Sequence, residues 1–264
     1  VQVPEKGQYA IAIRYAMLDS ASSQIERGVM INGQRPFEGS EAFLLSRQFE
    51  DAEYPFRKNE YGNDIRPQQN GVYSALETVL MERSAKDTNP LLFSFEAGEN
   101  TLTLTGVKGS VAILGITLKA PEEIPTYADY IAQYADEKPA VSVIAVEAEQ
   151  ILHRSSKSIQ NLTFQTPNVT PLEAGKKLLN AIGGDSWKSA HDYVEWRITV
   201  PETGLYCLGF NYNQGYNMAL TSFRTLTGDG EGPFREAEAI GLPVKSDWGR
   251  LIPGGDQPDT LLPK

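Results

Sequence analysis

The chain has 264 residues, and 34 Asp and Glu against 24 Lys and Arg give it a formal net charge of −10. This acidic balance argues against nucleic acid or an anionic membrane as the main partner. No apolar run approaches the length of a membrane-spanning helix. Cys207 is the single cysteine, so no intrachain disulfide forms, and its place inside a predicted strand predicts a buried thiol.

The first part of the chain is dominated by the alternation that is typical of half-buried β-strands. Residues 9–15 alternate, and an Asn-Gly pair at residues 32–33 predicts a two-residue hairpin turn. Residues 93–106 predict two strands joined by a tight turn at 98–100, and residues 111–118 predict a further strand. The side chains expected to share one face are Tyr9, Ile11, Ile13 and Tyr15 in the first of these strands, and Ala112, Leu114, Ile116 and Leu118 in the last.

Residues 51–89 are polar and broken by Pro and Gly, which predicts a long irregular insertion. Long loops on a rigid β-scaffold are where binding residues tend to lie. Residues 120–140 predict a connecting helix, because Tyr127, Tyr130, Ile131 and Tyr134 follow helical spacing and Thr126 is placed to cap the start.

The remaining part of the chain returns to β patterns. "VSVIAVEAEQ" at residues 141–150 predicts a strand, and residues 193–200 and 206–212 alternate in the same way as residues 9–15. One-sided strands with turns at this spacing favour an antiparallel sandwich over a parallel α/β sheet.

An internal repeat relates the two ends of the chain. "VPEKGQY" begins at Val3, and "VPETGLY" begins at Val200, which is 197 positions later. Several further residues match at the same offset without a gap. They are Tyr15 with Tyr212, Arg27 with Arg224, the Asn-Gly pair at 32–33 with Asp-Gly at 229–230, Pro-Phe at 36–37 with Pro-Phe at 233–234, and Glu-Ala at 41–42 with Glu-Ala at 238–239.

A repeat of this length predicts two copies of one domain rather than the units of a solenoid. We expect an all-β protein of two related antiparallel β-sandwich domains, at residues 1–124 and 141–264, joined by a short helical linker at 125–140. The alignment predicts that the first copy lacks its opening strands and the second its closing strands. An open sheet edge invites pairing, so we expect the second copy to be completed by the first copy or by another chain, or to stay partly open.

Catalytic patterns are scarce. The chain has only two histidines, His153 and His191, and neither lies in a metal-binding or nucleophile motif. The plentiful carboxylates leave open an acid–base pair for glycoside hydrolysis. Most acidic residues on an acidic chain are simply solvated, however, so we expect no enzymatic activity.

Both copies of the repeat resemble carbohydrate-binding modules with the galactose-binding-like jelly-roll fold. The resemblance is carried by "VPEKGQYAIAIRYA" and "YVEWRITVPETGLYCLGFNY", by "INGQRPF" and "GDGEGPF", and by "FEAGENTLTL". "VIAVEAEQ" resembles the opening strand of those modules, whose glutamates often bind a structural calcium. The resemblance thus implies Glu147 and Glu149 as metal ligands, and carboxylate oxygens suit that ion.

A wider resemblance covers nearly the whole chain. "IERGVMINGQRPFEGSEAFLLSRQFED", "FRKNEYGNDIRPQQ", "APEEIPTYADYIAQY", "LNAIGGDSW" and "PFREAEAIGLPVKSDW" are similar to the accessory region of large extracellular solute-binding lipoproteins of bacterial ABC sugar importers. This resemblance implies an extracellular, cell-surface location with a lipid anchor in the full-length protein. It also implies a permease or a solute-binding body as a partner.

A sugar site needs aromatic faces to stack on C–H groups, and amides, carboxylates or guanidinium groups to bind hydroxyls. Three stretches offer such sets. The candidate ligand-binding residues are Trp187 and Asp185 beside His191 and Asp192, then Trp248 and Asp247 beside Arg250, and then Asn63, Asp64 and Arg66 beside Tyr61 and Gln68. In each stretch the competing interpretation is packing for the tryptophans and internal hydrogen bonding for the polar loop.

Two functions therefore remain open. The first is a non-catalytic carbohydrate-binding region of a surface protein. The second is a structural or protein-interaction module that positions a solute-binding body at the cell surface. Arg27 and Arg224, which share one position of the repeat, favour a paired structural role, because two diverging binding sites need not keep one arginine.

Overall fold

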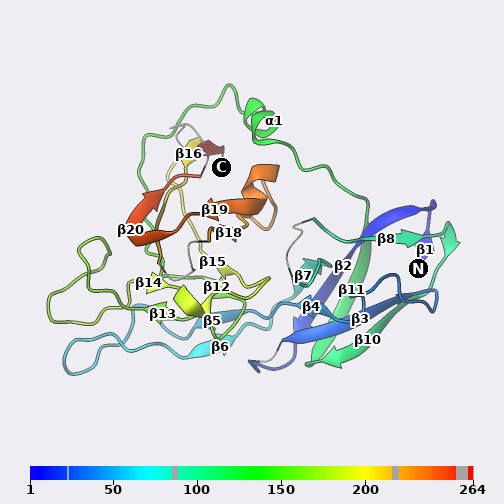
Figure 1. Cartoon of the computed structure of the whole chain (residues 1–264), viewed down its shortest axis with the longest axis horizontal. Coiled ribbons are helices and arrows are strands. Elements are labelled where there is room, and N and C mark those ends of the chain that lie inside the picture. Colours follow the sequence, from blue (N-terminus) through cyan, green and yellow to red (C-terminus); the bar gives the residue numbers. More distant parts are fainter. Residues whose placement is uncertain (23, 85–88, 216–219, 254–260, 264) are drawn as a thin grey trace. The chain divides into compact units, whose positions relative to one another are not determined.

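The computed structural model describes residues 1–22, 24–84, 89–215, 220–253 and 261–263, and these residues are mostly β (Figure 1). One α-helix, α1 (Tyr127–Ala132), lies among them. The expectation of a mostly β chain is confirmed. The chain divides into two compact units. Unit 1 contains Val1–Glu122, Ala148–Thr163 and Glu173–Arg197, and unit 2 contains Glu123–Glu147, Phe164–Leu172 and Ile198–Lys264.

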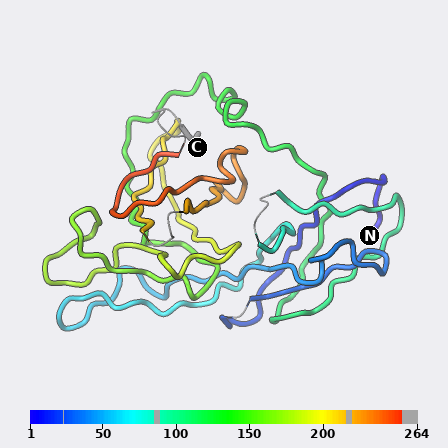
Figure 2. The backbone as a smooth tube through the Cα atoms, viewed as in Figure 1, coloured from blue at the N-terminus to red at the C-terminus, as the bar shows by residue number. Residues whose placement is uncertain are grey.

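Unit 1 is built on two antiparallel sheets whose central strands are β2 and β3. One sheet has the order β11-β2-β7, with β8 also paired to β2, and the other has the order β10-β3-β4. Figure 2 shows that segments far apart in the sequence, such as β2 and β11, run side by side. The strands of these sheets are β2 (Gly7–Met17), β3 (Ile25–Ile31), β4 (Phe43–Leu45), β7 (Leu76–Val79), β8 (Leu92–Phe95), β10 (Leu102–Lys108) and β11 (Val111–Lys119).

The core of unit 1 draws its side chains from both of these sheets. Ile11, Ile13 and Tyr15 of β2 are at most 1% exposed, which confirms the face expected from their alternation. Phe93 of β8 packs against Phe43 of β4 with ring centroids 5.9 Å apart. Because the alternating face of β2 is apolar, burying it provides the main driving force for this unit.

A third sheet of unit 1 has the order β15-β12-β5-β6, and it joins segments that the sequence places about 100 residues apart. The expected domain ranges assign these strands to different domains, so the compact units divide the chain differently, and the domain boundaries stay a prediction. The remaining elements of unit 1 are β1 (Gln2–Val3), β5 (Phe49–Asp51), β6 (Gln69–Gly71), β9 (Gly98–Glu99), β12 (His153–Arg154), β13 (Asn161–Leu162), β14 (Ala181–Ile182), η1 (Gly184–Ser186) and β15 (Val194–Glu195).

Unit 2 contains three antiparallel strand pairs, namely β16 with β21, β17 with β20 and β18 with β19. Thr126 caps α1 by accepting a hydrogen bond from the Asp129 N–H, as its position predicted. Tyr127 and Tyr130 of α1 pack on Phe234. The elements of unit 2 are α1, β16 (Leu205–Cys207), β17 (Phe210–Gln214), β18 (Ser222–Arg224), η2 (Arg235–Ala239), β19 (Ile240–Leu242), β20 (Lys245–Leu251) and β21 (Leu261–Pro263).

The two hairpin turns of the repeat have the same backbone conformation. Asn32 and Gly33 have φ of 51° and 77°, and Asp229 and Gly230 have φ of 50° and 91°. The flanking residues are bridged at equivalent positions, Ile31 to Gln34 and Gly228 to Glu231. Two successive positive φ angles define the type I′ turn, which the Asn-Gly and Asp-Gly pairs favour.

The strand register of the repeat is also the same in the two units. β3 pairs with β4, and β18 pairs with β19, at positions that all differ by the same 197 residues. The pairs are Ile25–Leu45, Glu26–Leu44 and Arg27–Phe43 in unit 1, and Ser222–Leu242, Phe223–Gly241 and Arg224–Ile240 in unit 2. Arg27 and Arg224 both donate from Nη1 to the carbonyl of the preceding residue, as a shared structural role predicts.

Tyrosine hydrogen bonds explain the shared "V-P-E-x-G-x-Y" motif and the tyrosine that follows it. In each copy the tyrosine of the motif donates a hydrogen bond to the carbonyl of the motif glutamate. The later tyrosine donates to the carbonyl of the residue that directly follows β4 in unit 1 and β19 in unit 2. The bonds are Tyr9–Glu5 at 3.0 Å and Tyr15–Ser46 at 2.7 Å in unit 1, and Tyr206–Glu202 at 2.9 Å and Tyr212–Pro243 at 3.0 Å in unit 2. The repeat is therefore one of tertiary contacts as well as of residues.

Replacing Tyr15 with phenylalanine is expected to cost about 1–3 kcal/mol of unfolding free energy, because its hydroxyl is buried and its loss leaves the Ser46 carbonyl without its donor. Tyr212→Phe removes the equivalent bond from a more exposed place, so its expected cost is below about 1 kcal/mol. Calorimetric unfolding of both variants checks this. Equal losses would contradict the difference in burial.

Four local expectations need correction. Residues 141–150 form no strand, and Cys207 lies in β16 but is exposed, although it shares a strand face with the buried Leu205. Residues 111–118 do form β11, but a register shift between Ile113 and Gly115 breaks the alternation, so Ala112 does not share a face with Ile116 and Leu118, and Leu114 lies unpaired at the shift. Residues 51–89 are less irregular than expected, since they include β6 and β7.

Candidate functional site

Residues 57–65 form a tight hairpin in unit 1, which we call the 57–65 hairpin. The Ile65 N–H donates to the Arg57 carbonyl at 2.8 Å, and the Asn59 N–H donates to the Asn63 carbonyl at 2.9 Å. The Asn59 side chain accepts from the backbone N–H groups of Tyr61 and Asn63, both at 3.0 Å. These bonds within the turn fix its backbone conformation without the help of a ligand.

Two of the expected ligand-binding residues hold this hairpin in place. Asn63 Oδ1 accepts from the Lys177 N–H at 2.7 Å, and Asp64 Oδ2 accepts from the Leu179 N–H at 2.8 Å. Asp64 Oδ1 also lies 2.6 Å from Lys58 Nζ, and the Asp64 side chain is only 7% exposed. Both side chains therefore anchor the loop, which is the structural alternative that the sequence left open.

The exposed surface of the same loop is aromatic and polar. Tyr61 at the tip is 72% exposed, and Tyr54 is 54% exposed and packs edge-on against Phe56 at 5.2 Å between ring centroids. Arg66 and Gln68 are exposed as well. The anchored hairpin thus presents a tyrosine ring to solvent from a fixed backbone, which keeps the entropic cost of ordering it on binding low.

Trp187 of unit 1 is half-buried, and its indole nitrogen is hydrogen-bonded within the protein. The indole N–H donates to the Asp192 carbonyl at 3.1 Å, and the ring lies against Gly183, where an added Cβ would come within 3.0 Å of it. Its neighbour Asp185 is exposed, and its carboxylate lies 4.0 Å from the ammonium of Lys188. The structure therefore places Trp187 in packing and leaves Asp185 in solvent.

The residues flanking Trp187 make internal contacts as well. His191 Nε2 lies 2.7 Å from the Glu82 carbonyl oxygen, and Asp192 Oδ1 accepts from the Ser155 hydroxyl at 3.0 Å. The other histidine, His153, lies 2.9 Å from Glu195 across the β12–β15 pair. The structure does not bring the two histidines or these carboxylates together around a nucleophile among the described residues.

Trp248 belongs to unit 2 and packs edge-on against Phe164 with ring centroids 4.9 Å apart. Its indole nitrogen is buried and has no hydrogen-bond partner among the described residues. Asp247 is exposed and accepts from the Trp248 N–H at 2.7 Å, and Arg250 is exposed on the same strand, β20. The expected Trp187 and Trp248 sets thus lie in different units.

The two glutamates expected to bind calcium do not form a fitting site. Thr170 Oγ1 donates to both carboxylate oxygens of Glu147 at 3.2 Å, and Glu149, which is 2% exposed, belongs to the other unit. Among the described residues, no group of three or more His, Cys, Asp and Glu is arranged to hold a metal ion. Calcium prefers six to eight oxygen ligands, which these residues do not supply.

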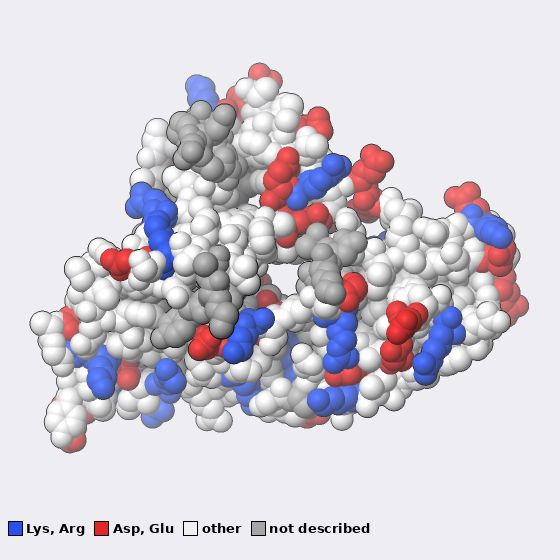
Figure 3. Space-filling model, viewed as in Figure 1, with Lys and Arg blue, Asp and Glu red and all other residues white. Residues whose placement is uncertain are grey.

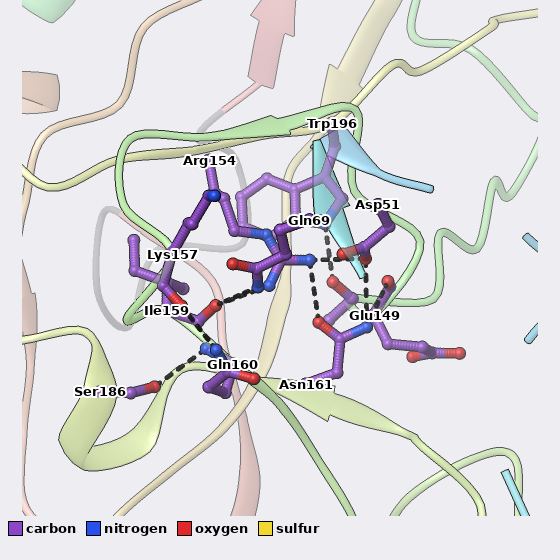
Figure 4. A network of polar contacts seen from close by, with 11 residues as sticks. Asp51, Gln69, Glu149, Arg154, Lys157, Ile159, Gln160, Asn161, Ser186 and Trp196 are labelled. Carbon is purple, nitrogen blue, oxygen red and sulfur yellow. Dashed lines mark hydrogen bonds and ion pairs between the residues drawn. The ribbon is translucent and has the colours of Figure 1, made fainter. Parts of the chain in front are cut away.

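The most deeply buried polar cluster of unit 1 was not expected from the sequence. We call it the Arg154 clamp, formed by Asp51, Arg154, Ile159 and Asn161 (Figure 4). Arg154 is 0% exposed and donates from Nη1 to the Ile159 carbonyl at 2.6 Å and from Nη2 to Asp51 Oδ2 at 2.5 Å. A further bond at 3.1 Å reaches Asn161 Oδ1. The clamp joins β5, β12 and β13.

Removing either charge of the buried Asp51–Arg154 pair is expected to lower the stability of unit 1. Burial raises the pKa of Asp51 against the opposing effect of the Arg154 charge, and burial likewise lowers the pKa of Arg154. Asp51 Oδ1 and Arg154 Nε have no partner among the described residues. Gln69 Nε2 adds a bond to the Ile159 carbonyl at 3.2 Å, so the same carbonyl accepts from two side chains. This arrangement fixes three chain segments and offers no free nucleophile or proton donor to solvent.

Charged side chains of both signs are spread over the face shown in Figure 3 rather than gathered into one field. Ion pairs at the surface include Lys6 with Glu96 at 2.8 Å and Lys119 with Glu77 at 2.8 Å. Within the described residues, no helix has both the length and the apolar character that crossing a membrane requires.

Comparison with models of protein families, with curated proteins and with solved structures finds no significant match to this chain.

Proposed function

We propose that this chain is a non-catalytic carbohydrate-binding region, built of two related β-sandwich modules, of an extracellular solute-binding protein linked to ABC sugar uptake. The observation that carries the proposal is the exposed Tyr61 ring at the tip of the anchored 57–65 hairpin. A flat ring held in solvent can stack on the apolar face of a sugar, and the exposed Arg66 and Gln68 supply hydrogen-bond donors for hydroxyls.

The duplication supports a binding role as well. The two copies share the I′ turn, the strand register and the tyrosine hydrogen bonds, which supports two copies of one module. Two modules on one chain raise the avidity for a polymer that offers repeated units, even when each module binds weakly. Of the three aromatic residues expected to meet sugar, Tyr61 is the most exposed, and both tryptophans lie in packed positions.

Titration of the chain with a panel of soluble polysaccharide fragments, followed by calorimetry, tests the proposal. Saturable binding is expected, and Tyr61→Ala is expected to weaken it about tenfold, since one aromatic stacking contact contributes about 1–1.5 kcal/mol. Tyr73→Ala is the matched control, because Tyr73 is also exposed, at 55%, but lies outside the hairpin. Unchanged binding by Tyr61→Ala would remove the hairpin from the site.

A second candidate is a structural or protein-interaction module that positions a solute-binding body at the cell surface. It is favoured by the engagement of Asn63 and Asp64 in anchoring the loop, because these side chains are then not available to a sugar. Absence of binding to every fragment in the panel, with a folded protein, would favour this candidate over the first.

A further inference from the structure

Residues 141–146, with the sequence V-S-V-I-A-V, have the composition of a β-strand, yet the side-chain hydrogen bond from Ser142 to Glu202 at 2.9 Å pairs no backbone groups. Val141 is 90% exposed and Val143 is 96% exposed. Among the residues that the structure describes, no backbone hydrogen bond joins this segment to another one, and it belongs to no strand. β-branched residues favour a pleated, half-buried surface, so two valines on one side of an unpaired segment predict that it pairs elsewhere.

The outer edge of β11 in unit 1 likewise lacks a neighbouring strand among the described residues. Within the described chain β11 pairs only with β2, on one side. Ile113 and Ile116 lie opposite Tyr15 and Ile13, which are core residues, yet they are 39% and 38% exposed.

One more apolar side chain extends this edge. Leu114, at the register shift of β11, is 52% exposed. A long, apolar, unpaired edge strand is a site for adding another strand. We call Ile113, Leu114 and Ile116 the β11 edge patch.

We propose that residues 141–146 of one copy of this chain add as a strand to the β11 edge of a second copy. The chain itself supplies both halves of the contact, an unpaired apolar strand and an unpaired apolar edge. Backbone hydrogen bonds along β11 would provide the affinity. Val141 and Val143 would cover the exposed apolar side chains of Ile113 and Ile116.

Charge and length fit this occupant. Residues 141–146 carry no charge, and neither do residues 111–118, so pairing them brings no like charges together. The segment is six residues long and β11 is nine, which leaves room for a strand of ordinary length. The contact is heterologous, because two different surfaces meet, so copies can exchange segments in a closed dimer or continue into larger assemblies.

Light scattering over a range of protein concentrations tests the proposal. A mass that rises above that of one chain with concentration is expected. Val143→Lys and Leu114→Lys are each expected to weaken the association about tenfold or more, because each places a charge in the apolar contact. Both side chains are exposed in the single chain, so circular dichroism should show an unchanged fold.

Leu220→Lys is the matched control, since it places the same charge at an exposed leucine, 64% exposed, outside both surfaces, and it should leave the association unchanged. A single-chain mass at every concentration would overturn the proposal. So would association that is lost with Leu114→Lys and kept with Val143→Lys, because that result would indicate that two β11 edges pair with each other.

Disulfide trapping identifies the two surfaces directly. Cys207 is exposed, so it is first replaced with serine. Val143→Cys protein and Ile116→Cys protein are then mixed under mild oxidation, and a mixed disulfide dimer is expected, whereas Leu220→Cys should trap with neither. Trapping no more efficient than with Leu220→Cys would contradict strand addition at β11.

Discussion

Replacing Arg154 with methionine is expected to lower the free energy of unfolding by about 3–5 kcal/mol. Methionine fills much of the volume but leaves the Asp51 carboxylate buried without its cation. The Ile159 carbonyl loses the donor of its shorter hydrogen bond, and Asn161 Oδ1 loses the donor from Arg154 Nη2. Calorimetric or denaturant unfolding measures the loss.

A double variant separates the ion pair from packing. Asp51→Leu together with Arg154→Met removes both charges, and it is expected to recover a large part of the stability, because apolar side chains of similar volume can replace a buried pair at little cost. Lys188→Met is the control, since its side chain is 75% exposed and it should change the stability by less than about 0.5 kcal/mol. A loss below about 1 kcal/mol in Arg154→Met would contradict a structural role for the clamp.

Raising the pH from 10 to 12 is expected to remove about 2 kcal/mol of stability from unit 1 for each of two buried tyrosines, Tyr193 and Tyr15. Burial raises the pKa of Tyr193 to about 12, and a hydrogen bond with Gln48 only partly opposes this shift. Burial also raises the pKa of Tyr15. Above pH 10 the unfolded phenols lose their protons while the folded ones keep them, so the stability is fully present below pH 10 and declines as the pH rises toward the folded pKa.

Unfolding measured at a series of alkaline pH values checks this decline. Tyr193→Phe should make the decline shallower, because phenylalanine has no proton to lose in either state and only the contribution of Tyr15 then remains. Tyr61→Phe is the control, since the Tyr61 ring is 72% exposed and its replacement should leave the slope unchanged. A wild-type stability that stays constant between pH 10 and 12 would contradict the burial of the two hydroxyls.

Strand positions and the repeat could be predicted from the sequence because alternation and turn chemistry are local signals. The face of β2, the cap at Thr126 and both I′ turns are encoded within a few residues each. β11 shows where such reasoning fails. A single register shift reversed the face of half the strand, and alternation in the sequence does not reveal where a bulge will fall.

Residues 141–150 show a second limit. Their composition favours a strand, yet a strand exists only where a neighbour accepts its backbone hydrogen bonds. Cys207 shows a related limit, because a strand position does not say which residues of a face the rest of the chain will cover. Both questions are decided by tertiary packing rather than by the local pattern.

The candidate site was less predictable than the fold. Asn63 and Asp64 have the residue types of a ligand site, but the sequence cannot say that backbone N–H groups more than 100 positions away would use them. Arg154 carried no signal at all, since its partner Asp51 lies 103 residues earlier. The exposure of Tyr61 was equally hidden, although the turn residues around it predicted a loop.

The long reach of the Arg154 clamp sets an order of events during synthesis. β5 emerges from the ribosome long before β12 and β15, its neighbours in the same sheet. At about 5–20 residues per second, the Asp51 carboxylate waits roughly 5–20 s for the guanidinium that will neutralise it. Unit 1 therefore cannot close as its first 122 residues leave the ribosome, and its final form depends on a segment made after α1.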